Sequence, residues 1–377
     1  MNDNRRATRA RIHLKNLDHN LNCIRTLVGP EKKICVAVKA DAYGHGAVEV
    51  SRRALRWGVD FLAVATVPEA IILREAGIDA PLILFSIATE REIEQIVEYS
   101  LTPFVCDLTY AKKIEAEAAR QKRTIQVHLK IDTGMGRIGA QPEKAADLAE
   151  VLSSLEYTKL QGVCTHFPVS DSPEKEDIDF TRMQIKIFTE TIETIRERGV
   201  DTGIIHAANS GAIISHPDAH FDMVRPGICF YGYYPDRRMD KAKADFRPLM
   251  EFISRPAFIK KVKKGTSISY GRTWKAPEET WIASIPAGYA DGYNRLLSSK
   301  ARVEIRGKLY PVAGRVCMDQ FMINLGSQSD VTTEDEVILF GPDGISPNAS
   351  DIGEITGTIP YEVTCSINKR VPRDYCE

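Results

Sequence analysis

Short apolar segments alternate with longer amphipathic segments along the first two-thirds of the chain, and this alternation constrains the fold more than any other feature. Between the short segments, apolar residues recur three and four positions apart among charged ones, which is typical of amphipathic helices. The short segments are nearly continuous in apolar character, as expected of parallel strands buried on both faces. We predict eight strands, at 34–40, 61–67, 81–87, 102–107, 125–132, 160–167, 202–209 and 222–227. Eight strand–helix units in about 210 residues predict an α/β fold, a (β/α)8 TIM barrel, with a doubly wound open sheet as the alternative.

The sequence changes character after about residue 243, where the long helical patterns end. Strand-like segments separated by Gly, Pro and charged turns follow, at 253–265, 280–289, 301–314, 317–325 and 335–341. Such spacing is typical of antiparallel sheets. We therefore predict two domains, a barrel over residues 1–243 and a C-terminal, mainly antiparallel β domain over residues 244–377.

The charge and composition of the 377-residue chain exclude several classes of protein. Lys and Arg total 50 and Asp and Glu total 51, so the net charge of −1 excludes a globally basic nucleic-acid-binding protein. No apolar run approaches the roughly 18 residues that a bilayer span requires, and none follows the Arg-rich N-terminus as in a secretory signal. The eight cysteines form no C-x-x-C pair, which favours free thiols in a reducing compartment over disulfides or a zinc site. We expect a cytoplasmic protein without nucleic-acid, membrane or metal binding.

Two short motifs suggest sites that the surrounding sequence argues against. Residues 134–139 read GMGRIG and match the dinucleotide fingerprint, but they follow the fifth predicted strand, and Gln141-Pro142 interrupts the start of the next helix. The segment HPDAH (216–220) has histidines four positions apart, but Pro217 disfavours a metal-binding helix. Neither motif is interpreted as a cofactor or metal site.

Polar residues follow the ends of several predicted strands. In a (β/α)8 barrel, reactive residues lie at the carboxyl ends of the strands and in the loops after them. The residues found there are Lys39, Lys130, Asp132, Arg137, His166, His206, Asn209-Ser210-Gly211 and Arg225-Pro226-Gly227. This polar enrichment predicts an active site at that rim.

Lys39, at the end of the first predicted strand, permits two interpretations. Its stem can cross the rim with the ammonium in water, or a partly desolvated amine can act as a Schiff-base lysine. Across the barrel mouth, 209–211 offers a hydroxyl and 226–228 offers backbone N–H groups beside a glycine, both suited to phosphate. A phosphate site opposite a lysine suggests pyridoxal phosphate, although each motif alone also fits an ordinary turn.

The motifs together resemble those of the alanine racemases, which are pyridoxal-phosphate enzymes. They lie in family order at 37–46 (AVKADAYGHG), 130–139 (KIDTGMGRIG), 165–167 (THF), 206–212 (HAANSGA), 223–228 (MVRPGI), 269–274 (SYGRTW), 286–293 (PAGYADGY), 314–320 (GRVCMDQ), 359–362 (IPYE) and 369–373 (KRVPR). The resemblance covers nearly the whole chain. One departure is Pro168-Val169, where small residues are commoner, and it bears on the contacts of that loop.

The resemblance implies two catalytic bases and a set of cofactor contacts. Lys39 carries the cofactor covalently and is one base; Tyr270, contributed by the partner subunit, is the other. Arg225 faces the pyridine nitrogen, with His166 behind it. The groups implied to bind the cofactor phosphate and its surroundings are Tyr43, Asn209, Ser210, Gly227, Ile228 and Tyr361.

The resemblance also implies how substrate is bound and how the subunits assemble. Arg137 and the backbone of Met318 bind the substrate carboxylate, and Lys130 matches a lysine that is often carbamylated. Tyr289 and Arg315 narrow the entrance. The expected assembly is a homodimer with shared active sites, in which the β domain of each partner covers the other barrel.

The function implied is interconversion of L-alanine and D-alanine, which supplies D-alanine for peptidoglycan. Three alternatives stay open. The first is racemisation of another amino acid, such as serine, lysine or ornithine. The second is decarboxylation on the same architecture, which Arg225 disfavours because such decarboxylases usually offer an acid to the pyridine nitrogen. The third is a pyridoxal-phosphate carrier without activity, which the β domain disfavours.

Overall fold

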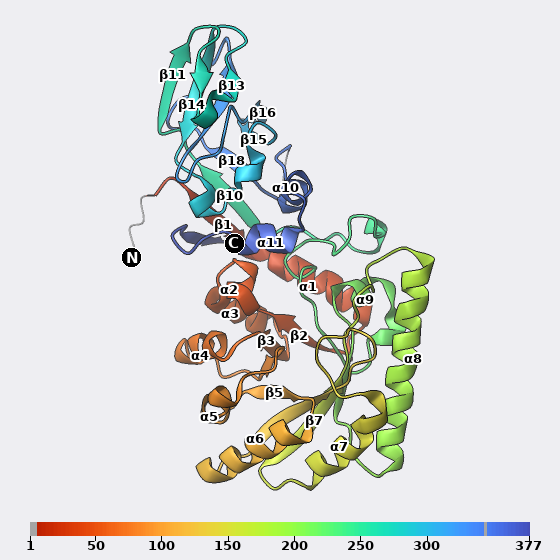
Figure 1. The fold of residues 1–377 in the computed structure, drawn as a ribbon. Helices are drawn as coiled ribbons and strands as arrows, with labels where there is room; N and C mark the ends of the chain where they lie inside the picture. Colours follow the sequence, from red (N-terminus) through yellow and green to blue (C-terminus); the bar gives the residue numbers. More distant parts are fainter. Residues whose placement is uncertain (1–5, 343–344) are drawn as a thin grey trace. The chain divides into compact units, whose positions relative to one another are not determined.

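The computed structural model describes residues 6–342 and 345–377. The chain forms two compact units (Figure 1). Unit 2 comprises Asp18–Ala42 and Ala47–Phe246, and unit 1 comprises the chain up to Leu17, Tyr43–Gly46 and the chain from Arg247 onward.

Unit 2 contains a closed barrel of eight parallel strands. In order they are β2 (Lys33–Ala37), β3 (Phe61–Val64), β4 (Leu82–Leu84), β5 (Thr102–Val105), β6 (Ile125–Lys130), β7 (Thr158–Cys164), β8 (Ile204–His206) and β9 (Met223–Val224). The last strand pairs in parallel with the first, as Lys33 lies opposite Met223. The predicted (β/α)8 barrel is confirmed, and the open-sheet alternative is wrong.

The strands are connected by helices that lie around the barrel (Figure 1). They are α3 (Ala47–Trp57), α4 (Val67–Glu75), α5 (Ile93–Glu98), α6 (Leu108–Gln121), α7 (Pro142–Ser154), α8 (Lys175–Glu197) and α9 (Ser210–Ser215), and α1 (Leu14–Val28) precedes β2. Their ends follow local chemistry: Thr66 and Glu69 form a capping box at α4, and Asp107 caps α6 by accepting from the N–H of Tyr110.

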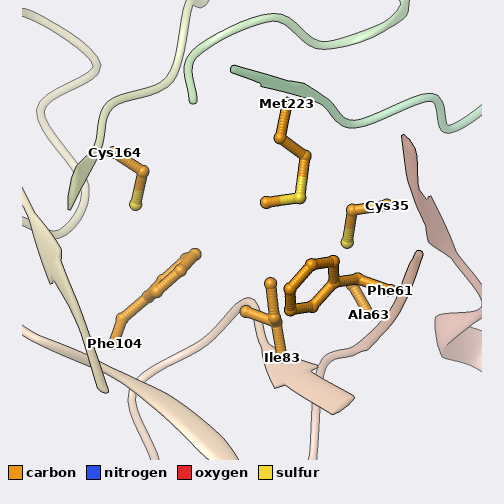
Figure 2. Close-up of a cluster of buried hydrophobic side chains, with 7 residues drawn as sticks. All are labelled: Cys35, Phe61, Ala63, Ile83, Phe104, Cys164 and Met223. Carbon is orange, nitrogen blue, oxygen red and sulfur yellow. The ribbon is translucent and has the colours of Figure 1, made fainter. Parts of the chain in front are cut away.

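The inward side chains of the barrel form a dense apolar layer. Figure 2 shows it as Cys35, Phe61, Ala63, Ile83, Phe104, Cys164 and Met223. Because successive side chains on a strand point to opposite faces, the inward residues alternate with residues that face the helices. Lys130 is two residues after the inward His128, and Arg225 is two residues after Met223. The same alternation therefore directs both basic side chains into the barrel mouth.

Unit 1 is built mainly of antiparallel β-structure. Its six-stranded sheet has the order β16 (Lys308–Pro311), β15 (Arg302–Ile305), β18 (Val337–Phe340), β10 (Met250–Ser254), β1 (Arg9–His13) and β19 (Arg373–Cys376). A three-stranded sheet contains β11 (Phe258–Val262), β14 (Thr280–Ile285) and β17 (Phe321–Gly326), and β12 (Ser267–Ile268) pairs with β13 (Trp274–Lys275). Two helices, α10 (Ala349–Thr356) and α11 (Pro360–Cys365), complete it. The predicted fold class, a barrel with a mostly-β C-terminal domain, is confirmed.

The structure differs from the predicted domain boundaries at the N-terminus. The first segment was assigned to the barrel with residues 1–243, but β1 pairs antiparallel with β10 and parallel with β19 and so belongs to unit 1. The short segment Tyr43–Gly46 also groups with unit 1, where the Arg373 side chain donates to the carbonyl of Gly44 at 3.0 Å. Both assignments depend on contacts between residues more than 200 positions apart, which a pass along the sequence does not reveal.

No helix among the described residues combines the length and apolar character needed to span a bilayer. All eight cysteines are free, and Cys35, Cys164 and Cys229 are buried.

Candidate active site

A cavity of about 330 Å³ in unit 2 brings together residues from the carboxyl ends of the barrel strands. It is lined by Lys39, Phe85, Ser86, Ile87, Phe104, Lys130, Arg137, Ile138, His166 and Arg225. Among these lining residues four side chains are cationic and none is acidic. A cavity with such a charge distribution favours an anionic ligand.

Lys39 begins an unusual turn directly after β2. The four residues that follow it, from Ala40 to Tyr43, all have φ between 51° and 54°, the left-handed helical region. For residues other than glycine this conformation costs about 1–2 kcal/mol each. The turn is held by the Glu69 carboxylate, which accepts from the N–H of Ala40 at 2.8 Å, and by the Asp41 carboxylate, which accepts from the N–H of Ala47 at 2.8 Å. Strain of this kind concentrates at functional sites.

Arg225 is 5% exposed and is held by four hydrogen bonds. Its Nη1 donates to Nδ1 of His206 at 2.7 Å, and its Nη2 lies 3.2 Å from Nδ1 of His166. Nη2 also donates to two backbone carbonyls, those of Thr165 and Ala207, each at 2.8 Å. Burial lowers the pKa of Arg225, but guanidinium groups remain charged in proteins. The site therefore contains a fixed positive charge that only donates hydrogen bonds.

Two buried histidines, His128 and His206, and the half-buried His166 lie near Arg225. Burial lowers the pKa of His166 and of His206 well below the usual value, and the positive charges of Lys130 and Arg225 act in the same direction. Burial likewise lowers the pKa of His128 to about 4. All three are therefore neutral at neutral pH. His128 was missed by the sequence analysis; its position two residues before Lys130 in an inward-facing register was the signal that could have identified it.

Lys130 is 4% exposed, and burial lowers its pKa to about 8. The charges of Arg225 and Arg137 contribute to this lowering, and the Nζ of Lys130 lies 5.8 Å from the ring centroid of Phe104. Arg137 itself lies in the GMGRIG loop, where the Asp132 carboxylate accepts from the N–H groups of Gly134 and Gly136. That motif is thus a tight turn that presents Arg137 to the cavity.

The loops after β8 and β9 are joined by Ser210. Its Oγ accepts from the N–H of Gly227 at 3.0 Å and from the N–H of Cys229 at 3.3 Å. Asn209, the N-cap of α9, donates to the carbonyl of Phe167 at 3.0 Å. The predicted residues Asn209, Ser210 and Gly227 therefore form one connected structure, and the predicted Ile228 is buried beside it.

The remaining predicted residues lie in unit 1 and form two groups. Tyr270 begins the short helix η4 (Tyr270–Arg272), and the Ser269 hydroxyl donates to the carbonyl of Arg315 at 2.7 Å. The N–H of Tyr289 donates to the carbonyl of Cys317 at 3.1 Å, and the N–H of Ala290 donates to that of Met318 at 3.0 Å.

Gly288 allows residues 288–290 to lie close to Met318, because a Cβ at position 288 would collide with the Met318 carbonyl. The first group thus contains Tyr270, Tyr289, Arg315 and Met318. In the second group the rings of Tyr43 and Tyr361 lie 5.7 Å apart between centroids.

The neutral histidines predict a loss of stability in acid. Unfolded histidines bind protons near their ordinary pKa of about 6.5, but the buried ones do not, so the unfolded state binds more protons below that pH. The free energy of unfolding therefore decreases as the pH falls below about 6.5, by up to about 1.4 kcal/mol per pH unit for each histidine.

Urea unfolding followed from about pH 7 to about pH 5 measures this slope. His128→Gln should reduce this slope, because it removes one buried neutral imidazole. An equal slope in the wild type and His128→Gln would contradict the prediction.

Comparisons with known proteins agree with this architecture. The chain matches the family model for the alanine racemase N-terminal domain over residues 12–235 and the model for the alanine racemase C-terminal domain over residues 249–375. It is 47% identical over 376 residues to the alanine racemase of Treponema denticola, covering 99% of each chain. It is 44% identical to the alanine racemase of Desulforamulus reducens, covering 97% of this chain and 98% of that one.

Solved structures extend the likeness to three dimensions. An alanine racemase from Clostridium difficile superposes with a TM-score of 0.93 at 40% identity, covering 98% of this chain and 96% of that one. An alanine racemase from Streptomyces coelicolor superposes with a TM-score of 0.92 at 35% identity, covering 98% of each. Because both domain models match in order and the relatives align over nearly their full length, the chain belongs to the alanine racemase family.

Proposed function

We propose that this protein interconverts L-alanine and D-alanine with pyridoxal phosphate, as a cytoplasmic homodimer that supplies D-alanine for peptidoglycan. The observation that carries the proposal is the cavity that contains Lys39, Arg225, His166 and Arg137 in a chain of this family. Racemisation of a different amino acid, such as serine, lysine or ornithine, is the alternative.

The residues present fit pyridoxal phosphate. The cofactor is anionic, and the cavity is lined by four cationic side chains and by no acidic one among its described lining residues. Lys39 supplies the amine that would hold it covalently, and Tyr43, Asn209, Ser210, Gly227, Ile228 and Tyr361 are the groups that would hold its phosphate end. When bound, the cofactor supplies an electron-withdrawing ring that makes the α-proton of an attached amino acid acidic.

Racemisation requires proton removal from one face of the α-carbon and proton delivery to the other. Two bases on opposite faces avoid the movement that a single base would have to make. We assign the first role to the Lys39 amine and the second to the phenol of Tyr270. Tyr270 is 73% exposed in the single chain, which supports its contribution to the site of a partner subunit.

Arg225 would determine the protonation state of the pyridine nitrogen of the cofactor. A guanidinium only donates hydrogen bonds, so a ring nitrogen facing Arg225 would accept and would stay unprotonated. A cofactor ring with an unprotonated nitrogen would withdraw electrons less strongly and would hold less negative charge. Side reactions such as transamination would then be disfavoured. The same argument disfavours the decarboxylase alternative, whose ring nitrogen faces an acid.

The substrate carboxylate would be bound by Arg137 and by the backbone of Met318, with Tyr289 and Arg315 at the entrance. The lowered pKa of Lys130 supports its carbamylation, because only a neutral amine adds to carbon dioxide. In that reaction the lysine nitrogen forms a bond to carbon, and one proton is released. The resulting carboxylate would lie among positive charges and orient Arg137.

Carbamylation of Lys130 predicts a specific signal. In protein equilibrated with ¹³C-labelled carbon dioxide, ¹³C NMR should show one carbamate resonance that is absent in Lys130→Ala. Acidification should abolish it, since protonation of the amine competes below its pKa of about 8. Lys186→Ala, at an exposed site on α8, is the control and should keep the resonance. A resonance that persists in Lys130→Ala would contradict the assignment.

The reaction and the preferred substrate are tested together by circular dichroism. Purified protein with added pyridoxal phosphate should abolish the optical activity of L-alanine and, at the same end point, that of D-alanine. A panel with serine, lysine and ornithine then compares kcat/KM. Faster turnover of one of these would replace alanine as the substrate, and release of carbon dioxide without racemisation would indicate a decarboxylase.

A further inference from the structure

We propose that Gln161 is a positioning residue that fixes the tautomers of two buried histidines, His128 and His206, and through them holds Arg225. The proposal rests on the proposed function only for its effect on catalysis, because the arrangement of protons itself is a property of the protein.

The four side chains form a continuous hydrogen-bonded row. Arg225 Nη1 lies 2.7 Å from His206 Nδ1, and His206 Nε2 lies 2.7 Å from His128 Nδ1. At the far end, His128 Nε2 lies 3.2 Å from the Gln161 side-chain oxygen. Both histidines are fully buried, so their ring nitrogens depend on these partners.

Arg225, which only donates, and the Gln161 side-chain oxygen, which only accepts, favour the same position for each imidazole proton in the row. A guanidinium only donates, so His206 Nδ1 must accept and the proton of the neutral ring lies on Nε2. That N–H donates to His128 Nδ1, which places the proton of His128 on its Nε2. The Gln161 oxygen then accepts from it. If this acceptor is lost, the buried Nε2–H of His128 is left without a hydrogen bond, which offsets the preference that Arg225 imposes. The opposite arrangement, with the proton on His128 Nδ1 and an N–H of His206 facing Arg225, then becomes competitive.

The row requires both histidines to be neutral, and their surroundings support this. A protonated ring donates from both nitrogens and would set two donors against each other. Burial is the main cause that lowers the pKa of each ring, and the charge of Arg225, in the loop directly after β9, adds to it. Lys130 on β6 has the same effect on His206, and the Gln161 hydrogen bond opposes it at His128. The ring of Phe104 on β5 lies against both imidazoles.

A β-bulge directs Gln161 to this position. Val127 pairs with Leu160 and His128 pairs with Gly162, so Gln161 is an extra residue in β7. Such bulges redirect a side chain that regular pairing would place elsewhere. Gly162 leaves the space: a Cβ there would lie 3.2 Å from His128 Nε2 and 2.5 Å from the Ile204 carbonyl. The pair Gln161-Gly162 therefore brings an acceptor to His128 inside the barrel.

The first experiment measures which ring nitrogens of His128 and His206 carry protons. In protein labelled with ¹⁵N-histidine, with bound pyridoxal phosphate, the ¹⁵N chemical shifts distinguish protonated from unprotonated ring nitrogens. Both His128 and His206 should be protonated on Nε2 and unprotonated on Nδ1 at neutral pH. The opposite tautomer, or a doubly protonated ring, would overturn the proposal without any substitution.

The second experiment removes the acceptor. In Gln161→Met we expect the other tautomer of His128 to appear and kcat to fall roughly tenfold at unchanged KM, within the 10²-fold that a 1 Å misplacement can cost. Gln161→Glu keeps an accepting oxygen and should restore the rate and the tautomer above about pH 7.5, where the ring stays neutral. Gln126→Met, at an exposed position on the adjacent β6, is the matched control.

The outcomes separate this proposal from the proposed function. Wild-type racemisation with an unaffected Gln161→Met variant overturns the positioning role alone. Absence of racemisation in the wild type overturns the function, while the NMR measurement still decides the arrangement of protons.

Discussion

Lys39→Ala should abolish the loss of optical activity of L-alanine, with a decrease in kcat beyond about 10⁴-fold, the upper end of what one general base contributes. The effect is expected to be this large because the lysine would serve both as the covalent attachment for the cofactor and as one of the two bases. Circular dichroism of alanine measures the rate, and the visible absorbance of the protein measures retained pyridoxal phosphate. Both signals should be lost together.

The control for Lys39→Ala is Lys112→Ala, which removes an exposed lysine from α6. It should retain both the rate and the absorbance. The Lys39 assignment fails if Lys39→Ala binds the cofactor with the wild-type absorbance and racemises alanine at a comparable rate.

Tyr270→Phe should lower racemisation in both directions by about 10²–10⁴-fold, the range for loss of a general acid or base. The substitution removes only the hydroxyl, so the ring and its packing are retained. Because Tyr270→Phe leaves Lys39 in place, the variant should still bind pyridoxal phosphate with the wild-type absorbance. This separates loss of the second base from loss of the cofactor.

Mixing the two inactive variants tests whether the bases come from different subunits. In a dimer with shared sites, a heterodimer of Lys39→Ala and Tyr270→Phe contains one site with both substitutions and one site with neither. Random exchange of subunits should therefore restore roughly a quarter of wild-type activity, as expected for a twofold dimer. If both bases came from the same chain, every site would carry one substitution and no activity would return.

Several features of the site could be predicted from single strands. The barrel rule placed Lys130, His166 and Arg225 at the carboxyl ends of predicted strands, and all three line the cavity. Lys39 followed from the end of the first apolar segment, although the strand ends at Ala37 and a left-handed turn follows. The predicted strands were generally too long because the polar residues at their ends belong to loops.

Other features depended on residues that meet only after folding. The sequence analysis included His206 among the rim residues and gave His128 and Gln161 no role. The register shift between β6 and β7 joins them, and an extra residue in one strand leaves no signal in the hydrophobic pattern. The same holds for β1, whose partners β10 and β19 are distant in sequence.

The sequence by itself determined the class of fold and the positions of the basic residues at the rim, because the apolar continuity of the strands and the spacing of the strand–helix units are local properties of the chain. The tertiary structure alone decided the charge of the cavity, the neutrality of its histidines and the partner of each ring nitrogen. These depend on burial and on distances of about 3 Å between strands, the scale at which hydrogen bonds form. Such distances are set by the register and closure of the whole barrel.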